Sequence, residues 1–139
     1  MVVDRYLVTA KIATIDRCLR RISEVRGERR AALLPIDVED IVLLNLQRAV
    51  QAAIDLAAHI VAAEGYGLPD SLAGAFSLLE AHGIIDAHLA TRLRNMVGLR
   101  NIAIHEYQAL NPSIVEAIVT RHLGDLRAFS SRVVQYFGL

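Results

Sequence analysis

The sequence is poor in the residues that break helices or build disulfide scaffolds. Its 139 residues include one cysteine, three prolines, eight glycines and no tryptophan. Cys18 has no partner for an internal disulfide, which excludes a disulfide scaffold and a multi-cysteine zinc site. The scarcity of glycine and proline argues against a turn-rich β-sandwich. Because 54% of the residues are hydrophobic, the chain can build a core, and a disordered segment is excluded as well.

Charged residues interrupt the stretches that could have served as a leader or a membrane anchor. Asp4, Arg5 and Lys11 lie where a signal peptide needs its apolar core. No apolar run approaches the roughly 20 residues that a membrane-spanning helix needs. We therefore expect a cytoplasmic protein that does not bind a membrane.

The formal net charge is zero, but the charges are unevenly distributed along the chain. Residues 1–30 contain eight basic and four acidic residues, whereas the rest of the chain contains seven basic and eleven acidic residues. A neutral protein lacks the basic face of a typical nonspecific nucleic-acid binder, although a local basic stretch can still contact phosphate. The simpler interpretation is a solvated helix face on which Glu24 and Glu28 pair with neighbouring arginines.

Apolar residues recur with helical spacing over almost the whole chain. The pattern predicts helices over residues 2–29, 37–64, 71–81, 86–107 and 111–137. No Asn-Gly or Asp-Gly turn joins two alternating stretches, so no β-hairpin is expected. We predict a single all-α domain over residues 1–139, folded as an up-and-down bundle of four long helices and one short helix.

Capping residues and apolar positions refine this prediction. The helix N-termini are expected at three residues with capping side chains, Asp37, Asp86 and Asn111. Glycines are expected just after helix ends, at Gly65, Gly83 and Gly138. In the first helix we expect one broad stripe that holds Tyr6, Ala10, Ala13, Arg17, Leu19 and Ile22.

Most sequence patterns that carry known chemistry are missing. Gly65-Tyr66-Gly67 is not followed by the Lys-Ser/Thr pair of a phosphate-binding loop, and no HExxH zinc helix occurs. His82 and His88 straddle Gly83 and do not share a helix face, which disfavours a metal site. Cys18 lies among arginines that could lower its pKa, but a buried core thiol is the simpler interpretation. We expect neither a metal nor a cofactor.

The stretch MVGLRNIAIHEY, from Met96 to Tyr107, places polar residues among apolar ones. On a straight helix Arg100 and Tyr107 would share one face, and Asn101 and His105 would form an i, i+4 pair. Arg100 and His105 would lie roughly 140° apart, so they would meet through bending of the arginine, through fraying, or across a symmetric dimer.

These residue types suit cleavage of a phosphodiester without a metal ion. Histidine titrates near neutrality and can transfer a proton to or from a ribose hydroxyl or a leaving oxygen. Arginine offers several donors to a phosphate and to its developing charge. The composition of this stretch fits a structural role equally well, in which its polar side chains cap the end of a helix by hydrogen bonding to free backbone carbonyls.

The segment GLRNIAIHEY resembles the Arg-x4–6-His signature of the HEPN superfamily. More narrowly it resembles the Arg-x4-His-x-Tyr pattern of the HepT toxin branch, with Arg100, His105 and Tyr107 in the three positions and Asn101 after the arginine. The segments LNLQRAVQAAIDLAAHIVAAEGYGLPDS and FSLLEAHGIID also resemble this branch, as does the run into MVGLRN. The resemblance covers residues 37–137, and the first helix is its least diagnostic part.

The resemblance implies a helical bundle that forms a homodimer, with two copies of the motif beside one cleft. It implies a metal-independent RNA endonuclease that acts as a toxin. The implied partner is a nucleotidyltransferase antitoxin of the MNT family, which can transfer AMP from ATP to the motif tyrosine, Tyr107. Arg100 and His105 would be catalytic, with Asn101 and Tyr107 in support. Attack by the ribose 2′-hydroxyl would leave a 2′,3′-cyclic phosphate.

Two other functions fit the same residues. A non-catalytic HEPN bundle could bind a nucleotide or substrate for a partner nucleotidyltransferase, with Arg100 as a phosphate anchor. The intact His105 argues against this alternative. A purely structural bundle is the second alternative. Expression of the protein in cells without a partner distinguishes a toxin from a binding module, because a toxin slows cell growth and a binding module does not. The sequence does not predict whether the RNA target is tRNA or mRNA.

Overall fold

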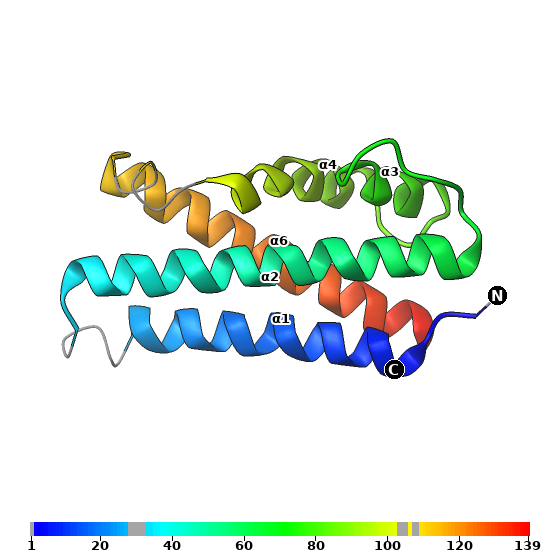
Figure 1. The fold of residues 1–139 in the computed structure, drawn as a ribbon, viewed down its shortest axis with the longest axis horizontal. Helices are drawn as coiled ribbons and strands as arrows, with labels where there is room; N and C mark the ends of the chain where they lie inside the picture. Colours follow the sequence, from blue (N-terminus) through cyan, green and yellow to red (C-terminus); the bar gives the residue numbers. More distant parts are fainter. Residues whose placement is uncertain (1, 28–32, 103–105, 107–108) are drawn as a thin grey trace.

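A computed structural model describes residues 2–27, 33–102, 106 and 109–139. Their secondary structure is helical, with no strand in this part of the chain, which confirms the all-α prediction (Figure 1). The elements in chain order are α1 (Arg5–Arg26), α2 (Pro35–Glu64), α3 (Gly74–Ala81), α4 (Ala87–Met96), the short 3-10 helix η2 (Val97–Asn101), and α6 (Pro112–Phe137).

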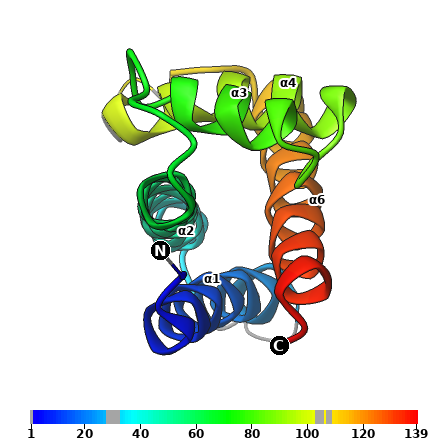
Figure 2. The same ribbon diagram turned by 90° about the vertical axis from the view of Figure 1, so that its right-hand side faces the viewer.

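The helices surround one apolar core. Helices α1 and α2 run antiparallel and lie side by side, α6 crosses behind them, and α3 and α4 cover the remaining side (Figures 1 and 2). Phe76 of α3 meets Phe129 of α6 edge to face in the core, with ring centroids 5.5 Å apart. Both rings are fully buried, so they tie α3 to α6 through apolar contact.

Short-range capping chemistry sets several helix ends. Asp86 precedes α4, and its Oδ1 accepts from the backbone N–H of Leu89 at 2.7 Å. Asn111 caps α6 by accepting from the backbone N–H of Ser113 at 2.8 Å. These two predictions are confirmed. Asp37 is not a cap, because α2 begins at Pro35 and Asp37 lies within its first turn. Proline fits there because the first helical residue needs no N–H donor.

The buried face of α1 differs from the expected stripe. Tyr6 is 87% exposed, and Ala10 and Ala13 are exposed as well. Of the predicted positions, Leu19 and Ile22 are buried. The face that packs on the core consists of Val8, Ile12, Ile15, Cys18, Leu19, Ile22 and Val25. The predicted stripe is rotated about the helix axis from the buried face, because the prediction included small and aromatic residues and left out the β-branched residues that are buried.

The predicted helix over residues 86–107 is wrong in length, because α4 ends at Met96. The chain tightens into η2 and is extended at Ile102, with φ −77° and ψ 124°. Among the described residues the bundle therefore contains three helices of more than 20 residues, α1, α2 and α6, with the shorter α3 and α4 packed beside them. The side chain of Gln47 holds the segment that follows, because its Nε2 donates to the carbonyls of Leu99, at 3.3 Å, and Ile102, at 2.7 Å.

One described helix, α2, is long and apolar enough to cross a membrane by length and composition, with a mean hydropathy of 1.3 over its best window. This finding contradicts the expectation that no apolar run approaches the length of a membrane-spanning helix. More than half of that window, 56%, is buried inside the bundle. Since α2 contacts α1, α3, η2 and α6, its apolar residues are accounted for by the core.

Candidate active site

Arg100 lies on the surface near the end of η2, held against α2. Its Nε donates a hydrogen bond to Oε1 of Gln51 at 3.0 Å. The side chain is exposed, and no described residue accepts from its terminal Nη1 and Nη2 atoms. The arginine is therefore anchored through Nε, while its Nη1 and Nη2 have no acceptor among the described residues. This leaves the paired donors that bind phosphate in a bidentate manner.

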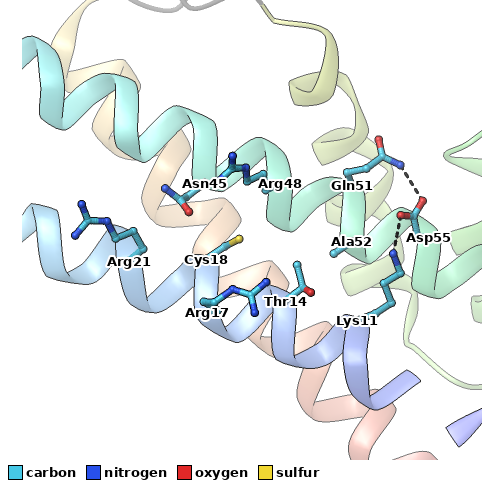
Figure 3. Close-up of a pocket in the computed structure, with 10 residues that line it drawn as sticks. All are labelled: Lys11, Thr14, Arg17, Cys18, Arg21, Asn45, Arg48, Gln51, Ala52 and Asp55. Atoms are coloured by element: carbon cyan, nitrogen blue, oxygen red, sulfur yellow. Dashed lines mark hydrogen bonds and ion pairs between the residues drawn. The ribbon is translucent and has the colours of Figure 1, made fainter. Parts of the chain in front are cut away.

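Gln51 connects Arg100 to a polar chain on the surface of α2. Its Nε2 donates to Oδ1 of Asp55 at 2.9 Å, and Oδ2 of Asp55 accepts from Nζ of Lys11 at 3.2 Å (Figure 3). The amide can therefore present only its oxygen to Arg100, because its nitrogen is already directed at a carboxylate. The orientation of Gln51 is fixed from both ends.

The other predicted site residues have different outcomes. Asn101 is exposed and is the last residue of η2, adjacent to Arg100. His105 and Tyr107 lie outside the described residues. The expected straight-helix geometry is wrong, because η2 ends at Asn101 and Ile102 is extended. The predicted face shared by Arg100 and Tyr107 and the predicted pairing of Asn101 with His105 depend on residues that lie outside the described part of the chain.

Cys18 is a buried thiol, as the simpler interpretation expected. It is 4% exposed and has no disulfide. Burial raises the pKa of the Cys18 thiol, and the positive charges of Arg17 and Arg48 oppose this shift more weakly. A raised pKa disfavours the thiolate that a nucleophilic cysteine needs.

Of the two histidines considered for a metal site, His82 has ordinary structural contacts and His88 is exposed. The ring of His82 stacks on Tyr66, with centroids 3.8 Å apart, and its Nδ1 lies 3.0 Å from the carbonyl of Leu78. Within the described ranges no group of three or more histidine, cysteine or acidic side chains could hold a metal ion.

Comparison with known proteins identifies the family of the chain that carries this site. The chain matches the family described as "Ribonuclease HepT-like" over residues 15–133. It belongs to the HepT-like ribonuclease family. The motif that contains Arg100, Asn101, His105 and Tyr107 lies inside the matched region, and the resemblance inferred from the sequence is confirmed.

Curated relatives span nearly the same length as this HepT-like chain. It is similar to the mRNA nuclease HepT of Shewanella oneidensis, with 43% identity over 88% of this chain and 92% of the relative. It is also similar to a protein of Archaeoglobus fulgidus named as a putative RNase, with 32% identity over 94% of this chain and 91% of the relative.

Solved structures share the fold. A tri-AMPylated Shewanella oneidensis HEPN toxin in complex with MNT antitoxin is 42% identical, with a TM-score of 0.79 over 91% of this chain and 96% of that chain. A toxin–antitoxin structure with AMP-PNP is 41% identical with the same TM-score and coverage. The cytosolic protein YutE of Bacillus subtilis, 14% identical with a TM-score of 0.77 over 98% of this chain and 92% of that chain, shows likeness of fold alone.

Sequence reasoning missed the two glutamines that position the motif of this HepT-like protein. Gln47 fixes the backbone on either side of Arg100, and Gln51 fixes its side chain. Both lie on α2, 49 or more residues away in sequence from the groups they contact. The only sign of them in the sequence is their spacing of four residues on one helix, and this spacing does not indicate which distant groups they contact.

Proposed function

We propose that this protein is an RNA endonuclease that acts as the toxin of a HEPN/MNT toxin–antitoxin pair, and that its nuclease reaction needs no metal ion. The observation that carries the proposal is the anchoring of Arg100, an exposed residue whose Nε is held by Gln51 while its terminal nitrogens have no acceptor among the described residues. A fixed guanidinium with two open donors is suited to a phosphate whose charge grows during reaction. The relatives named as a ribonuclease and as an mRNA nuclease support this choice of substrate.

In the proposed reaction a ribose 2′-hydroxyl attacks the adjacent phosphorus. A new bond forms between O2′ and phosphorus, and the bond from phosphorus to O5′ of the next nucleotide breaks. His105 takes the hydroxyl proton or gives one to the leaving oxygen, because imidazole is half-protonated near neutrality. Arg100 holds the phosphate and Asn101 orients His105 or the phosphate. The products carry a 2′,3′-cyclic phosphate and a 5′-hydroxyl.

Tyr107 is proposed as both a substrate contact and the point of control. An MNT-type antitoxin would transfer AMP to its hydroxyl, as the AMPylated state of the Shewanella oneidensis toxin in complex with MNT antitoxin suggests. The added phosphate is an anion seven residues from Arg100, and it would compete with RNA for the guanidinium. We place the active species in the cytoplasm as a homodimer, with a motif from each copy beside one cleft.

An RNase assay in EDTA tests the nuclease. The protein is produced without an antitoxin, and its mass is measured to exclude an added AMP. We expect the wild type to cleave total RNA and His105→Ala to be at least about a hundredfold slower. Full activity in His105→Ala, or activity that needs added metal, would contradict the mechanism. Tyr107→Phe that remains fully neutralised by the antitoxin would contradict the proposed control.

The second candidate is a nucleotide-binding module that works with a nucleotidyltransferase. Its supporting observation is the structure of a toxin–antitoxin relative with AMP-PNP, an ATP analogue. The same Arg100 would anchor a nucleotide phosphate without turnover. Unmodified protein that binds ATP and leaves RNA intact would favour this function over the nuclease.

A further inference from the structure

A groove of about 560 Å³ runs between α1 and α2, on the side of α2 that carries Gln51 (Figure 3). We call it the α1–α2 groove. Its lining contains four cationic side chains and one carboxylate, namely Lys11, Arg17 and Arg21 of α1 with Arg48 and Asp55 of α2. This local excess of positive charge is notable in a protein whose net charge is zero. Such a surface attracts anions.

Two of these cations are not engaged by carboxylates. Arg17 and Arg48 are exposed, and neither forms an ion pair with another residue in the described part of the chain. Arg21 has an exposed partner, Glu24, at 3.6 Å, and Lys11 is paired with Asp55. Exposed pairs of this kind are weak and exchange readily with a competing anion. The predicted pairing of Glu24 with a neighbouring arginine is found at Arg21, whereas Glu28 lies outside the described residues.

The groove is continuous with the candidate active site. Gln51 lines the groove and at the same time accepts the hydrogen bond from Nε of Arg100. A ligand in the groove can therefore extend past Gln51 to the guanidinium without crossing the bundle. The groove cations of α1 span ten residues, from Lys11 to Arg21, or about 15 Å of helix axis. This length accommodates more than one phosphate of an extended chain.

The lining also indicates which part of a nucleic acid is recognised. Arginine and lysine contact phosphate, and the lining contains no tyrosine or phenylalanine on which a base could stack. We propose that the α1–α2 groove binds the sugar–phosphate backbone of single-stranded RNA flanking the phosphate held by Arg100. This inference rests on the proposed nuclease function and names where its substrate lies. Binding in the groove is independent of base sequence and sensitive to salt.

The test variant is Arg17→Gln/Arg48→Gln, which removes one cation from each side of the groove. Its matched control is Arg20→Gln/Arg121→Gln, which removes two exposed arginines that do not line the groove. Both variants change the net charge by the same amount. All four side chains are exposed, so we expect both variants to keep the thermal midpoint of the wild type.

Binding is measured by fluorescence anisotropy with a labelled oligouridylate of about twelve nucleotides, between about 50 and 200 mM salt. His105→Ala is the background, so that the probe stays intact. The logarithm of the binding constant falls with the logarithm of the salt concentration, and each lost phosphate contact makes this negative slope less steep by about 0.7 for a single strand. We expect the slope of the groove variant to be less steep than that of the wild type by about 1.4, and the slope of the control to change little. Equal slopes in the two variants would overturn the proposal.

Cleavage kinetics separate this proposal from the nuclease itself. With the oligouridylate as substrate and His105 intact, the groove variant is expected to raise KM at least fivefold with kcat unchanged, whereas both variants cleave a dinucleoside monophosphate like the wild type. A wild type that binds the oligouridylate through the groove but does not cleave it would refute the nuclease function alone. Conversion of the groove variant from dimer to monomer, seen by light scattering, would instead make the groove an interface between copies and overturn the inference.

Discussion

Gln51 and Arg100 lie 49 residues apart in sequence, yet Oε1 of Gln51 accepts a 3.0 Å hydrogen bond from Nε of Arg100. Because the other end of the same amide is bound to Asp55, the acceptor cannot turn away from the arginine. The contact therefore fixes which edge of the guanidinium is available for substrate. It makes Gln51 a positioning residue for the proposed reaction.

The first prediction concerns this contact. Gln51→Met keeps the length of the side chain and removes the acceptor, so Arg100 loses its orientation. Because the guanidinium is charged, this hydrogen bond is worth about 1.5–3 kcal/mol, which corresponds to a decrease of about 12- to 160-fold in kcat/KM for RNA. The measurement is steady-state cleavage of an oligonucleotide, with the thermal midpoint as a check on folding.

Gln51→Glu is the informative companion. It restores an acceptor for Arg100 but adds a charge that competes with the phosphate and lies beside Asp55. We expect KM to rise more than in Gln51→Met, with the difference shrinking at high salt. Equal kinetics for both variants and the wild type would show that the contact with Arg100 does not position the guanidinium.

The second prediction separates the charge of Arg100 from its shape. Arg100→Lys keeps the positive charge but loses the planar set of donors and the Nε that Gln51 holds. We expect affinity for RNA to change by less than about fivefold, whereas kcat falls by about 100-fold, as when a transition-state donor is lost. Arg121→Lys, an exposed change on α6, is the control. A lysine variant with unchanged kcat would assign Arg100 a purely electrostatic role.

The parts of the structure that were predictable from sequence depend on neighbours along the chain. The caps at Asp86 and Asn111 are local, because each side chain bonds to a backbone N–H two or three residues away. The all-α class follows from the period of the apolar residues, which is also a local property. The motif around Arg100 was identified because its family signature is contiguous.

The parts that were not predictable depend on distant side chains. Helix α4 ends at Met96, and the segment after it is held by Gln47 of α2, whose Nε2 donates to the carbonyls of Leu99 and Ile102, more than 50 residues later in the chain. The groove exists because α1 and α2 pack so that Arg17 and Arg48 line one surface. Periodicity does not specify the rotation of one helix against another to this accuracy, as the misplaced stripe of α1 shows.

The third prediction concerns an ion pair that joins α4 to α6. Asp125 is 4% exposed, and its Oδ1 accepts from Nε of Arg92 at 2.8 Å, whereas the Arg92 side chain is 44% exposed. Removing the arginine leaves a buried carboxylate without its partner, whereas Asp125→Asn leaves an exposed arginine that water can solvate. Arg92→Gln is expected to lower the free energy of unfolding by about 2 kcal/mol, and Asp125→Asn by about 1 kcal/mol.

Urea denaturation measures both variants, and unchanged m-values would show that the same cooperative transition is compared. Arg127→Gln, an exposed change two residues away on α6, is the control for loss of charge. The decisive result is which of the two variants, Arg92→Gln or Asp125→Asn, loses more free energy of unfolding. If Asp125→Asn were the more destabilising change, the carboxylate would contribute through contacts other than Arg92.

The fourth prediction is a dependence of stability on pH that originates at His122. Burial lowers the pKa of His122 below its ordinary value of 6.5. Arg121 lowers it further, and Asp125, whose Oδ2 lies 3.7 Å from Nδ1 of His122, opposes the shift without cancelling it. Arg92 of α4 faces the same carboxylate. The folded protein therefore binds the proton less tightly than the unfolded chain does.

It follows that the contribution of His122 to stability is fully present above pH 6.5 and is lost as the pH falls below that value. We expect the free energy of unfolding of the wild type to decrease more steeply between about pH 7 and pH 5 than that of His122→Gln. Urea denaturation at several pH values gives both slopes, and their difference isolates this histidine from the other titrating groups. Parallel curves for the two proteins would mean that His122 has the same proton affinity folded and unfolded.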